Sequence, residues 1–531
     1  MSKTTRSFVT GAAILAVAGL IVKVIGAFFR IPLANAVGSV GMCYYEVAYP
    51  YYAGLLVVST AGFPTAISKM VSEYVSLGDY AGAKRVFRVA LVILAGIGLF
   101  TGALMFVGSG ALANLSTFTE ASLSFKALAP ALFFVSVMCA YRGYLQGMQM
   151  MTGTAVSQVA EQVFKLIVGL FLAIKLLPKG PEYAAMGALI GVTVSELAGL
   201  AVIIVYYLSK RDIFEGQIEK QTVYRDIDRG TMANHLIAIA LPITIGASIS
   251  PLSGIVDSAL IGRILRGLGF AEEAAQTAFS LLRTNVTTLV NMPSVLTMAL
   301  AMSLVPAISY AMAQRDYKSV RTNVQLGLKL ALIIGLPCAV GLFILSKPVL
   351  ALLYPTLSPA NLDIAAELLK TASVGVLFLS LVQSMTGAIQ GIGKPSIPVF
   401  NLFIGFILKV ISMCVLMRMP HINIQGAAVS TVVLYAYAGL ADVAYALRVT
   451  KLRVRFLDVV LKPVICTGAM GVVVYLCYEL FQSHGRLGTL LPILAGVAVY
   501  ALLCILLRVF TETELLQIPG GHKLRRVMYR K

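Results

Sequence analysis

The sequence predicts an all-α polytopic membrane protein with about fourteen transmembrane helices. Of its 531 residues, 59% are hydrophobic and only 12% are charged, and the mean hydropathy is +0.88. Soluble domains carry about 25% charged residues. Fourteen apolar runs are long enough to cross roughly 30 Å of hydrocarbon. Because backbone polar groups must be paired in lipid and the runs lack period-two alternation, we expect helices rather than barrel strands.

The fourteen runs follow one another from the N-terminus almost to the C-terminal tail. The first run resembles a signal peptide, because Lys3 and Arg6 precede it and Ala34-Asn35-Ala36 looks like a cleavage site. Its apolar region exceeds the usual 7–15 residues, so we expect it to be retained as the first span. The predicted spans are residues 8–29, 44–63, 87–112, 124–145, 154–177, 184–208, 236–262, 277–304, 324–345, 371–391, 397–417, 424–447, 459–481 and 488–507.

The distribution of Lys and Arg predicts the orientation. When the connections are assigned to alternate sides, 27 basic residues lie on the side of the two termini and 10 on the opposite side. The positive-inside rule therefore places both termini in the cytoplasm of a bacterial cell, with the spans in the cytoplasmic membrane. We attribute most of the net charge of +19 to topology and to attraction by anionic lipid, and we expect no nucleic-acid partner.

Cysteine and histidine patterns give no sign of a metal or cofactor. The seven cysteines contain no CxxC spacing, and the four histidines contain no HExxH motif or other paired spacing. The connections are short, and no phosphate-binding loop or nucleophile elbow is present. We therefore expect neither a metal site, nor a cofactor, nor an enzyme.

Two pairs of similar segments indicate an internal repeat. QGMQMMTGTAVSQVAEQVFK (146–165) matches QGIGKPSIPVFNLFIGFILK (390–409) at its ends, with an offset of 244 residues. PTAISKMVSEYVSLGDY (64–80) resembles PAISYAMAQRDY (306–317), and pairing Ile67-Ser68 with Ile308-Ser309 gives an offset of 241. An even number of spans in each half makes the repeat parallel. We predict a first six-helix lobe over 1–235, a second over 236–455, and two additional spans with a basic tail over 456–531.

Charged residues inside the predicted spans are the candidates for function, because each costs about 2.5–3.5 kcal/mol at the centre of a spanning helix. Such a residue needs a partner or a purpose. The set is Lys23, Glu46, Glu161, Lys165, Glu196, Asp257, Arg283, Lys409 and Asp442.

Two stretches have polar residues on one helical face. Gly19, Lys23, Gly26 and Arg30 recur at i, i+4, i+7 and i+11, which predicts an open, positive face. The alternative is that Arg30 snorkels to the interface while the glycines serve helix packing. The second stretch is a polar stripe formed by Arg283, Thr284, Thr287, Thr288 and Asn291. A water-filled cavity or interhelical hydrogen bonding would explain it.

Glu161 and Lys165 are spaced to pair along their own helix. Lys409, the repeat counterpart of Lys165, has Gly405 in place of the glutamate. We therefore expect Lys409 to use a partner on another helix, with Asp257 or Asp442 as the natural candidates, although both acids could be packing residues.

Lys23, Arg30 and Arg283 have no acid within one helical turn along the sequence. A cavity lined by these cations would attract an anion. The most plausible group is a phosphate held by charge-assisted hydrogen bonds.

The chain resembles the polysaccharide-transporter branch of the multidrug/oligosaccharidyl-lipid/polysaccharide exporters. The resemblance lies in STAGFPTAISKMVSEY (59–74), RGYLQGMQMMTGTAVSQVAEQVFK (142–165), VDSALIGRIL (256–265), SLVPAIS (303–309) and AIQGIGKPSIP (388–398), and it covers most of the chain. This branch is similar to the lipid II flippases, which implies fourteen spans, two lobes that open alternately, and a cationic central cavity.

The resemblance implies a flippase that carries a polyprenyl-pyrophosphate-linked saccharide across the cytoplasmic membrane, with the two extra spans forming a groove for the lipid tail. Lys23 and Arg30 match basic residues expected in the first span. Arg283 departs from the family pattern, because relatives carry an arginine nearer Pro293, about where Thr288 stands.

We predict substrate binding by Lys23, Arg30, Arg283 and Lys409, with the other polar residues contributing to the cavity or to coupling. These are Glu46, Glu161, Lys165, Asp257, Asn291 and Asp442. The expected partners are a lipid-linked oligosaccharide, the bilayer, and a driving ion (H⁺ or Na⁺) or the membrane potential. The sequence leaves open which glycan is carried and whether it serves growth or sporulation. The alternative function is a proton- or sodium-coupled exporter of drugs or cations, which would use acids such as Asp257 and Glu46.

Overall fold

The computed structural model describes residues 3–224, 228–452, 454–482, 485, 487–512 and 514. The side chains of residues 3–16, 20, 23, 27 and 487 lie outside this description, as does most of the predicted basic tail. Every regular element in the described residues is a helix, which confirms the predicted all-α class.

The chain forms two compact units, which we call the first unit (Met1–Ser280) and the second unit (Leu281–Lys531). The division falls inside the predicted eighth span, whereas the sequence repeat predicts a lobe boundary after residue 235. The lobe boundaries therefore stay predictions.

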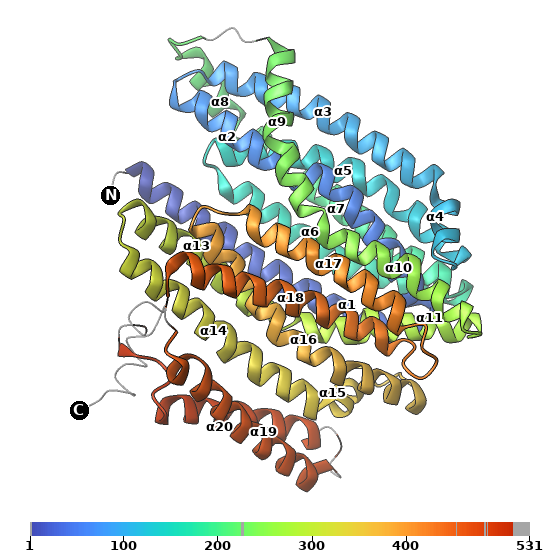
Figure 1. Ribbon diagram of the computed structural model, residues 1–531. Helices are drawn as coiled ribbons and strands as arrows, with labels where there is room; N and C mark the ends of the chain where they lie inside the picture. Colours follow the sequence, from blue (N-terminus) through green and yellow to red (C-terminus); the bar gives the residue numbers. More distant parts are fainter. Residues whose placement is uncertain are drawn as a thin grey trace. The chain divides into compact units, whose positions relative to one another are not determined.

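Eleven α-helices make up the described part of the first unit, and nine α-helices with two π-helical turns make up that of the second (Figure 1). In the first unit they are α1 (Lys3–Thr60), α2 (Phe63–Ser76), α3 (Tyr80–Val107), α4 (Ser109–Leu115), α5 (Ser122–Gly147), α6 (Met151–Leu176), α7 (Pro181–Ser209), α8 (Arg211–Glu219), α9 (Arg229–Ala247), α10 (Ile249–Gly267) and α11 (Glu272–Ser280). In the second unit they are η3 (Leu281–Val286), α12 (Thr287–Asn291), α13 (Ser294–Ala313), α14 (Tyr317–Ile344), α15 (Ser346–Leu353), α16 (Pro359–Gly391), α17 (Ser396–Leu416), α18 (Gln425–Thr450), η4 (Leu457–Leu461), α19 (Lys462–Phe481) and α20 (Leu487–Leu506).

Twelve segments of the described residues are long and apolar enough to span a membrane. The first of them, Val17–Ser76, contains a break at Gly38, so its two sides count as separate spans. With α6, which is 26 residues long, the number reaches the fourteen that the sequence predicts. The protein is a multi-pass membrane protein, and its orientation in the membrane stays a prediction.

The break in α1 is the sharpest departure from regular helix. Gly38 has φ 76° and ψ 176°, a combination that is accessible essentially only to glycine. Pro32 and Pro50 lie in the helix on either side. The chain turns back at this glycine, so residues of the two arms of α1 can face one another (Figure 1).

In the first unit, α6 and α7 pack side by side, and α1 packs along α6 (Figure 1). An aromatic cluster joins α3, α5, α7 and α8, where the rings of Phe87 and Tyr144 lie 4.9 Å apart and those of Tyr207 and Phe214 lie 5.6 Å apart. Phe214 is the buried residue of α8, so the cluster attaches this short helix to the bundle.

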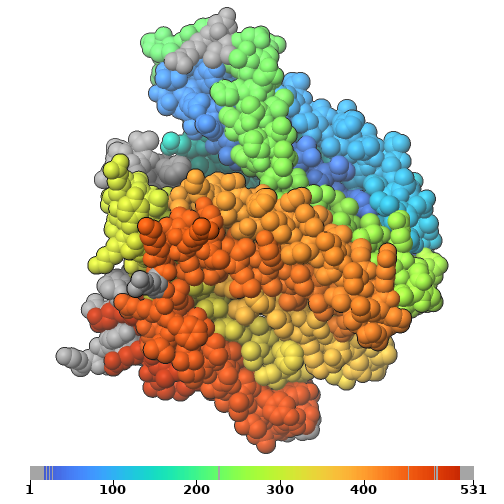
Figure 2. Space-filling view, in the orientation of Figure 1, coloured from blue at the N-terminus to red at the C-terminus, as the bar shows by residue number. Residues whose placement is uncertain are grey.

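In the second unit, α16 packs against α14 and α18, while α17 lies against α18. Figure 2 shows α17 and α18, in orange, forming much of the visible face of this unit. Exposed apolar side chains recur along α17 at helical spacing, as lipid-facing residues do: Phe400, Phe403, Ile407, Ile411 and Val415.

The two units share several details of packing. Helices α3 and α14 are both 28 residues long and both begin after a capping aspartate, Asp79 and Asp316. The hydroxyl of Ser72 donates to the Gly147 carbonyl at 3.0 Å, and that of Ser309 donates to the Gly391 carbonyl at 3.2 Å. Asp79 and Asp316 are 237 residues apart, and so are Ser72 and Ser309.

The predicted offset of 241 in this block is therefore wrong by one helical turn. Ser68 and Ser72 lie four residues apart on one face of α2, so the sequence pattern alone does not decide which of them matches Ser309. The hydrogen bond to the glycine carbonyl identifies Ser72 as the counterpart.

Candidate functional site

Among the charged side chains of the first unit, six on α1, α5, α6 and α7 form a group of ion pairs and buried charges. We call them the first-unit charge cluster: Arg30, Glu46, Arg142, Glu161, Lys165 and Glu196. Three are basic and three acidic, and they interact in three different ways.

Arg30 and Glu46 form an ion pair across the break in α1. Their atoms Nη2 and Oε1 lie 2.9 Å apart, and the glutamate side chain is fully buried. Sixteen residues of straight helix would separate them by about 24 Å, so the turn at Gly38 is what brings them together. Arg30 has no acid within one helical turn along the sequence, because its partner comes from the returning arm of α1.

Arg142 on α5 forms an ion pair with Glu161 on α6 and donates to the Ser157 hydroxyl from Nε at 3.2 Å and from Nη2 at 2.9 Å. Ser157 in turn donates to the Thr154 carbonyl, which leaves its oxygen free to accept. The sequence assigns Arg142 to a connection, but α5 continues to Gly147. The predicted pairing of Glu161 with Lys165 is wrong, since the carboxylate binds the arginine of a neighbouring helix.

Gly199 on α7 makes room for this ion pair. A Cβ atom there would lie 2.6 Å from Cγ of Glu161, closer than carbon atoms approach. The Arg142–Glu161 ion pair therefore depends on a glycine at this position of α7.

Lys165 lies against two aromatic rings rather than a carboxylate. Its Nζ is 5.3 Å from the centre of the Phe29 ring and 5.2 Å from that of Tyr49, within the range of cation–π attraction. Among the described residues it makes no ion pair. Its N–H groups therefore remain suited to an anion.

Glu196 on α7 and Arg142 on α5 are the two members of the cluster that our predicted site residues omit. Oε1 of Glu196 accepts a long hydrogen bond of 3.5 Å from the Tyr52 hydroxyl, while its buried Oε2 has no hydrogen-bond partner within the described residues. The sequence places Glu196 among the charges inside apolar spans, but we assigned it no role there. A carboxylate in this environment is a candidate for binding a proton or a cation.

The second unit has a neutral counterpart of the Arg142 site. Asp442 on α18 accepts a hydrogen bond of 2.8 Å from the Asn401 amide and one of 3.4 Å from the Thr386 hydroxyl. Asp442 is thus held by uncharged donors and not by Lys409, which rules out one of the two suggested partners for that lysine. Lys409 itself is 2% exposed on α17.

The remaining predicted residues lie on separate elements. Asp257 is buried on α10 of the first unit. In the second unit, Arg283 is half-buried in the π-helical turn η3 and Asn291 is exposed at the end of α12. Thr287 donates to the Leu282 carbonyl, five residues back, so the turn is wider than the α-helix that the predicted stripe assumes. The helix carrying Lys23 is described, but its side chain is not.

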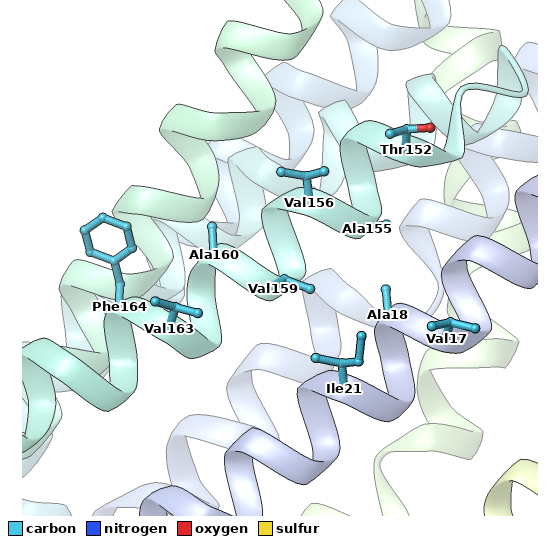
Figure 3. Close-up of a pocket in the computed structure, with 10 residues that line it drawn as sticks. All are labelled: Val17, Ala18, Ile21, Thr152, Ala155, Val156, Val159, Ala160, Val163 and Phe164. Carbon is cyan, nitrogen blue, oxygen red and sulfur yellow. The ribbon is translucent and has the colours of Figure 1, made fainter.

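An apolar groove of about 780 Å³ lies between α1 and α6 (Figure 3). Val17, Ala18 and Ile21 line it from α1, and seven residues line it from α6. Phe29, which contacts Lys165, lies eight residues, or about 12 Å, beyond Ile21 along α1. The groove and the lysine therefore share one seam between two helices.

The chain matches two protein families. Residues 8–312 match the family described as polysaccharide biosynthesis protein, and residues 277–415 match the MatE family. Stage V sporulation protein B of Bacillus subtilis (strain 168) is 27% identical over 97% of this chain and 98% of its own length. Lipid II flippase MurJ of the same organism is 26% identical over 80% of each chain.

Solved structures agree on the fold. The inward closed conformation of lipid II flippase MurJ gives a TM-score of 0.69 at 18% identity, covering 93% of this chain and 99% of that chain. An inward-facing multidrug resistance MATE family transporter gives 0.66 at 14% identity, covering 81% and 94%. The chain thus belongs to the polysaccharide biosynthesis protein family, and it has the fold of lipid II flippase MurJ and of the multidrug resistance MATE family transporter.

Proposed function

We propose that the protein is a flippase for a polyprenyl-pyrophosphate-linked saccharide resembling lipid II. The observation that carries this proposal is Lys165, a lysine inside the first unit that lies against two aromatic rings and makes no ion pair in the described residues. A cation in a span is costly unless it has a purpose, and here the purpose would be to bind an anion.

The chemistry of a pyrophosphate suits this lysine. The Lys165 ammonium group has three N–H donors, and each charge-assisted hydrogen bond is stronger where water is excluded. Arg30 approaches the same region, because Phe29, its neighbour in α1, contacts Lys165. Its planar guanidinium could grip a phosphate with two parallel hydrogen bonds, and Glu46 would hold it in place.

The apolar groove along the same seam adds a surface for the hydrocarbon part of such a substrate. Its walls are almost entirely apolar (Figure 3), and Phe164, the residue before Lys165, is one of the residues that line it. The groove that the resemblance implies in the two extra spans stays a separate prediction. Transport would proceed by alternating access from the inner to the outer leaflet, with both termini in the cytoplasm.

Residues of the second unit extend the proposal. Arg283 and Lys409 stay predicted substrate-binding residues, and Asn291, Asp442 and, in the first unit, Asp257 stay predicted residues of the polar lining or of coupling. We propose Lys23 for the substrate site by its position in the first span alone.

Glu196 favours a second candidate, an exporter of cations coupled to protons or sodium ions. Its Oε2 is buried without a hydrogen-bond partner in the described residues, and a cationic drug or a coupling ion could fill that position. The same residue could instead serve ion coupling in a flippase.

A binding assay separates the two functions. The purified protein in lipid nanodiscs is titrated with a fluorescent polyprenyl-pyrophosphate saccharide. Lys165→Met should weaken binding at least about tenfold, because a charge-assisted contact is worth about 1.5–3 kcal/mol. Lys175→Met is the matched control, since Lys175 also lies on α6 over a ring, that of Phe171, but is exposed.

The control should bind like the wild type, and a hydrophobic cation should not compete. Equal affinity of the wild type and Lys165→Met would overturn the proposed site. Displacement of the lipid by a hydrophobic cation, abolished in Glu196→Gln, would favour the cation exporter.

A further inference from the structure

The chain after α20 is fixed to α14 by a buried ion pair. Nζ of Lys329 donates to both carboxylate oxygens of Glu514, at 2.9 and 2.7 Å, and to the Val509 carbonyl at 3.0 Å. The lysine is fully buried. All three donors of the ammonium group are used, so its charge is neutralised where it lies.

Beside this ion pair is a hollow of about 180 Å³ with an excess of positive charge. Lys318, Arg321 and Arg455 line it in addition to Lys329 and Glu514. The other acid of the lining, Asp458, lies 2.7 Å from Lys462 and is already paired. The lining thus holds four cations, Lys318, Arg321, Lys329 and Arg455, against two acids, so positive charge is in excess.

Arg321 is held in a fixed orientation. Its Nε donates to the Thr450 carbonyl at 2.8 Å, which leaves the two terminal nitrogens for another acceptor. Lys318 and Arg455 make no ion pair or side-chain hydrogen bond within the part of the chain that the structure describes. A positioned guanidinium flanked by two further cations matches the oxygens of a phosphate group.

In the first unit, protein atoms fill the equivalent place. With the offset of 237 between α3 and α14, Lys84 and Arg85 correspond to Arg321 and Thr322. There Arg85 lies 4.6 Å from the centre of the Tyr224 ring and donates to its hydroxyl at 3.2 Å. The connection after α8 thus covers the start of α3, whereas the start of α14 borders an open hollow.

We propose that the hollow lined by Lys318, Arg321 and Arg455 binds a phosphate group, supplied by an anionic phospholipid headgroup or by a soluble phosphate. The bound phosphate would offset the excess positive charge of the lining. It would also strengthen the attachment of the tail and the two extra spans to the second unit. This site is independent of the proposed transport site, which lies on other helices.

The test uses the full chain, delipidated in a neutral detergent, and measures binding and the thermal unfolding temperature. The probes are phosphatidylglycerol, zwitterionic phosphatidylcholine and inorganic phosphate. We expect phosphatidylglycerol to bind more tightly than phosphatidylcholine and to raise the unfolding temperature. Arg321→Gln with Arg455→Gln should weaken its binding at least about tenfold.

Lys84→Gln with Lys210→Gln is the matched control, because it removes the same charge from the first unit. The control should bind like the wild type, and Lys318→Gln alone should cause a smaller loss than the double variant. All three side chains of the site border the surface, so the variants should fold. If inorganic phosphate binds with the same dependence on Arg321 and Arg455, the source is soluble. If neither phosphatidylglycerol nor inorganic phosphate binds more weakly to the double variant than to the wild type, the site is overturned.

Discussion

Arg142 in the first unit and Thr386 in the second stand at matching positions of the repeat, 244 residues apart, yet their surroundings differ in charge. Arg142 binds Ser157 and forms an ion pair with Glu161, while Thr386 shares Asp442 with Asn401, the counterpart of Ser157. The counterpart of Glu161 is Gly405. One unit balances its buried acid with a cation from the next helix, and the other holds its acid with neutral donors.

The frameworks around these sites are nearly the same. A Cβ on Gly98 would meet Ser136, and one on Gly335 would meet Ser380, at positions matching across the repeat. Because packing is repeated and the Arg142–Glu161 ion pair is not, we infer that the helix contacts serve the fold that both units need. The ion pair serves a task specific to the first unit, whereas Lys165 has a basic counterpart in Lys409.

The largest expected effect comes from breaking the Arg142–Glu161 ion pair. Arg142→Met leaves a buried carboxylate without its cation, which should cost about 3–5 kcal/mol in the free energy of unfolding. Thr386→Val in the second unit removes one long hydrogen bond and should cost less than about 1 kcal/mol. Denaturant unfolding in detergent micelles measures both.

A double-mutant cycle sharpens this result. Arg142→Met with Glu161→Met should recover most of the loss, because both charges leave together. Glu161→Gln with Lys165→Met should show little coupling, since the glutamate binds the arginine. Strong coupling of Glu161 to Lys165 and none to Arg142 would contradict the arrangement of the charge cluster.

The second prediction tests the shared framework. Gly147→Ala places a Cβ 2.6 Å from Cβ of Val71, and Gly391→Ala places one 2.8 Å from Cβ of Ile308. Each should destabilise its unit by about 1–3 kcal/mol through overpacking. Gly341→Ala is the control, because nothing lies within 4 Å of its added atom, and it should be neutral or slightly stabilising. A loss in only one of the two units would mean that the packing is not equivalent.

The smallest effects concern the two helix caps. Asp79 is buried and accepts from the Gly82 amide at 2.7 Å, so Asp79→Ala should cost about 1–2 kcal/mol. Asp316 is exposed and caps α14 through the amides of Lys318 and Ser319, both at 3.1 Å, so Asp316→Ala should cost less. The order of the two losses, from unfolding curves at neutral pH, checks the comparison.

The Asp316 cap should also depend on pH. Hydrogen bonds from the Ser319 hydroxyl and the two amides lower the pKa of Asp316 below its ordinary value. A lowered pKa in the folded state contributes stability that is present above the ordinary pKa, about 3.9, and is lost as the pH falls through the folded value. The stability difference between the wild type and Asp316→Ala should therefore shrink below about pH 4. A difference that stays constant with pH would show that the cap does not act through the carboxylate.

The sequence predicted the helical fold and the number of spans because apolar length is a local property. It could not predict contacts between helices. Arg142 lies near the end of its apolar run and looked like part of a connection, and Glu46 reaches Arg30 only because the chain turns back at Gly38. The pairing of Glu161 with Lys165 followed the spacing within one helix, but a stronger partner came from α5. The sequence thus identified these residues correctly as charges inside spans, but only the structure shows which residues they contact.

The most direct test of the account is transport by Lys165→Met in proteoliposomes. The measurement is the rate at which a fluorescent polyprenyl-pyrophosphate saccharide becomes accessible to an impermeant quencher, with Lys175→Met as the control. We predict that Lys165→Met lowers the rate at least about tenfold while the control stays within about twofold of the wild type. Equal rates for the wild type and Lys165→Met, with both folded and inserted, would contradict the claim that this lysine of the first unit binds the transported anion.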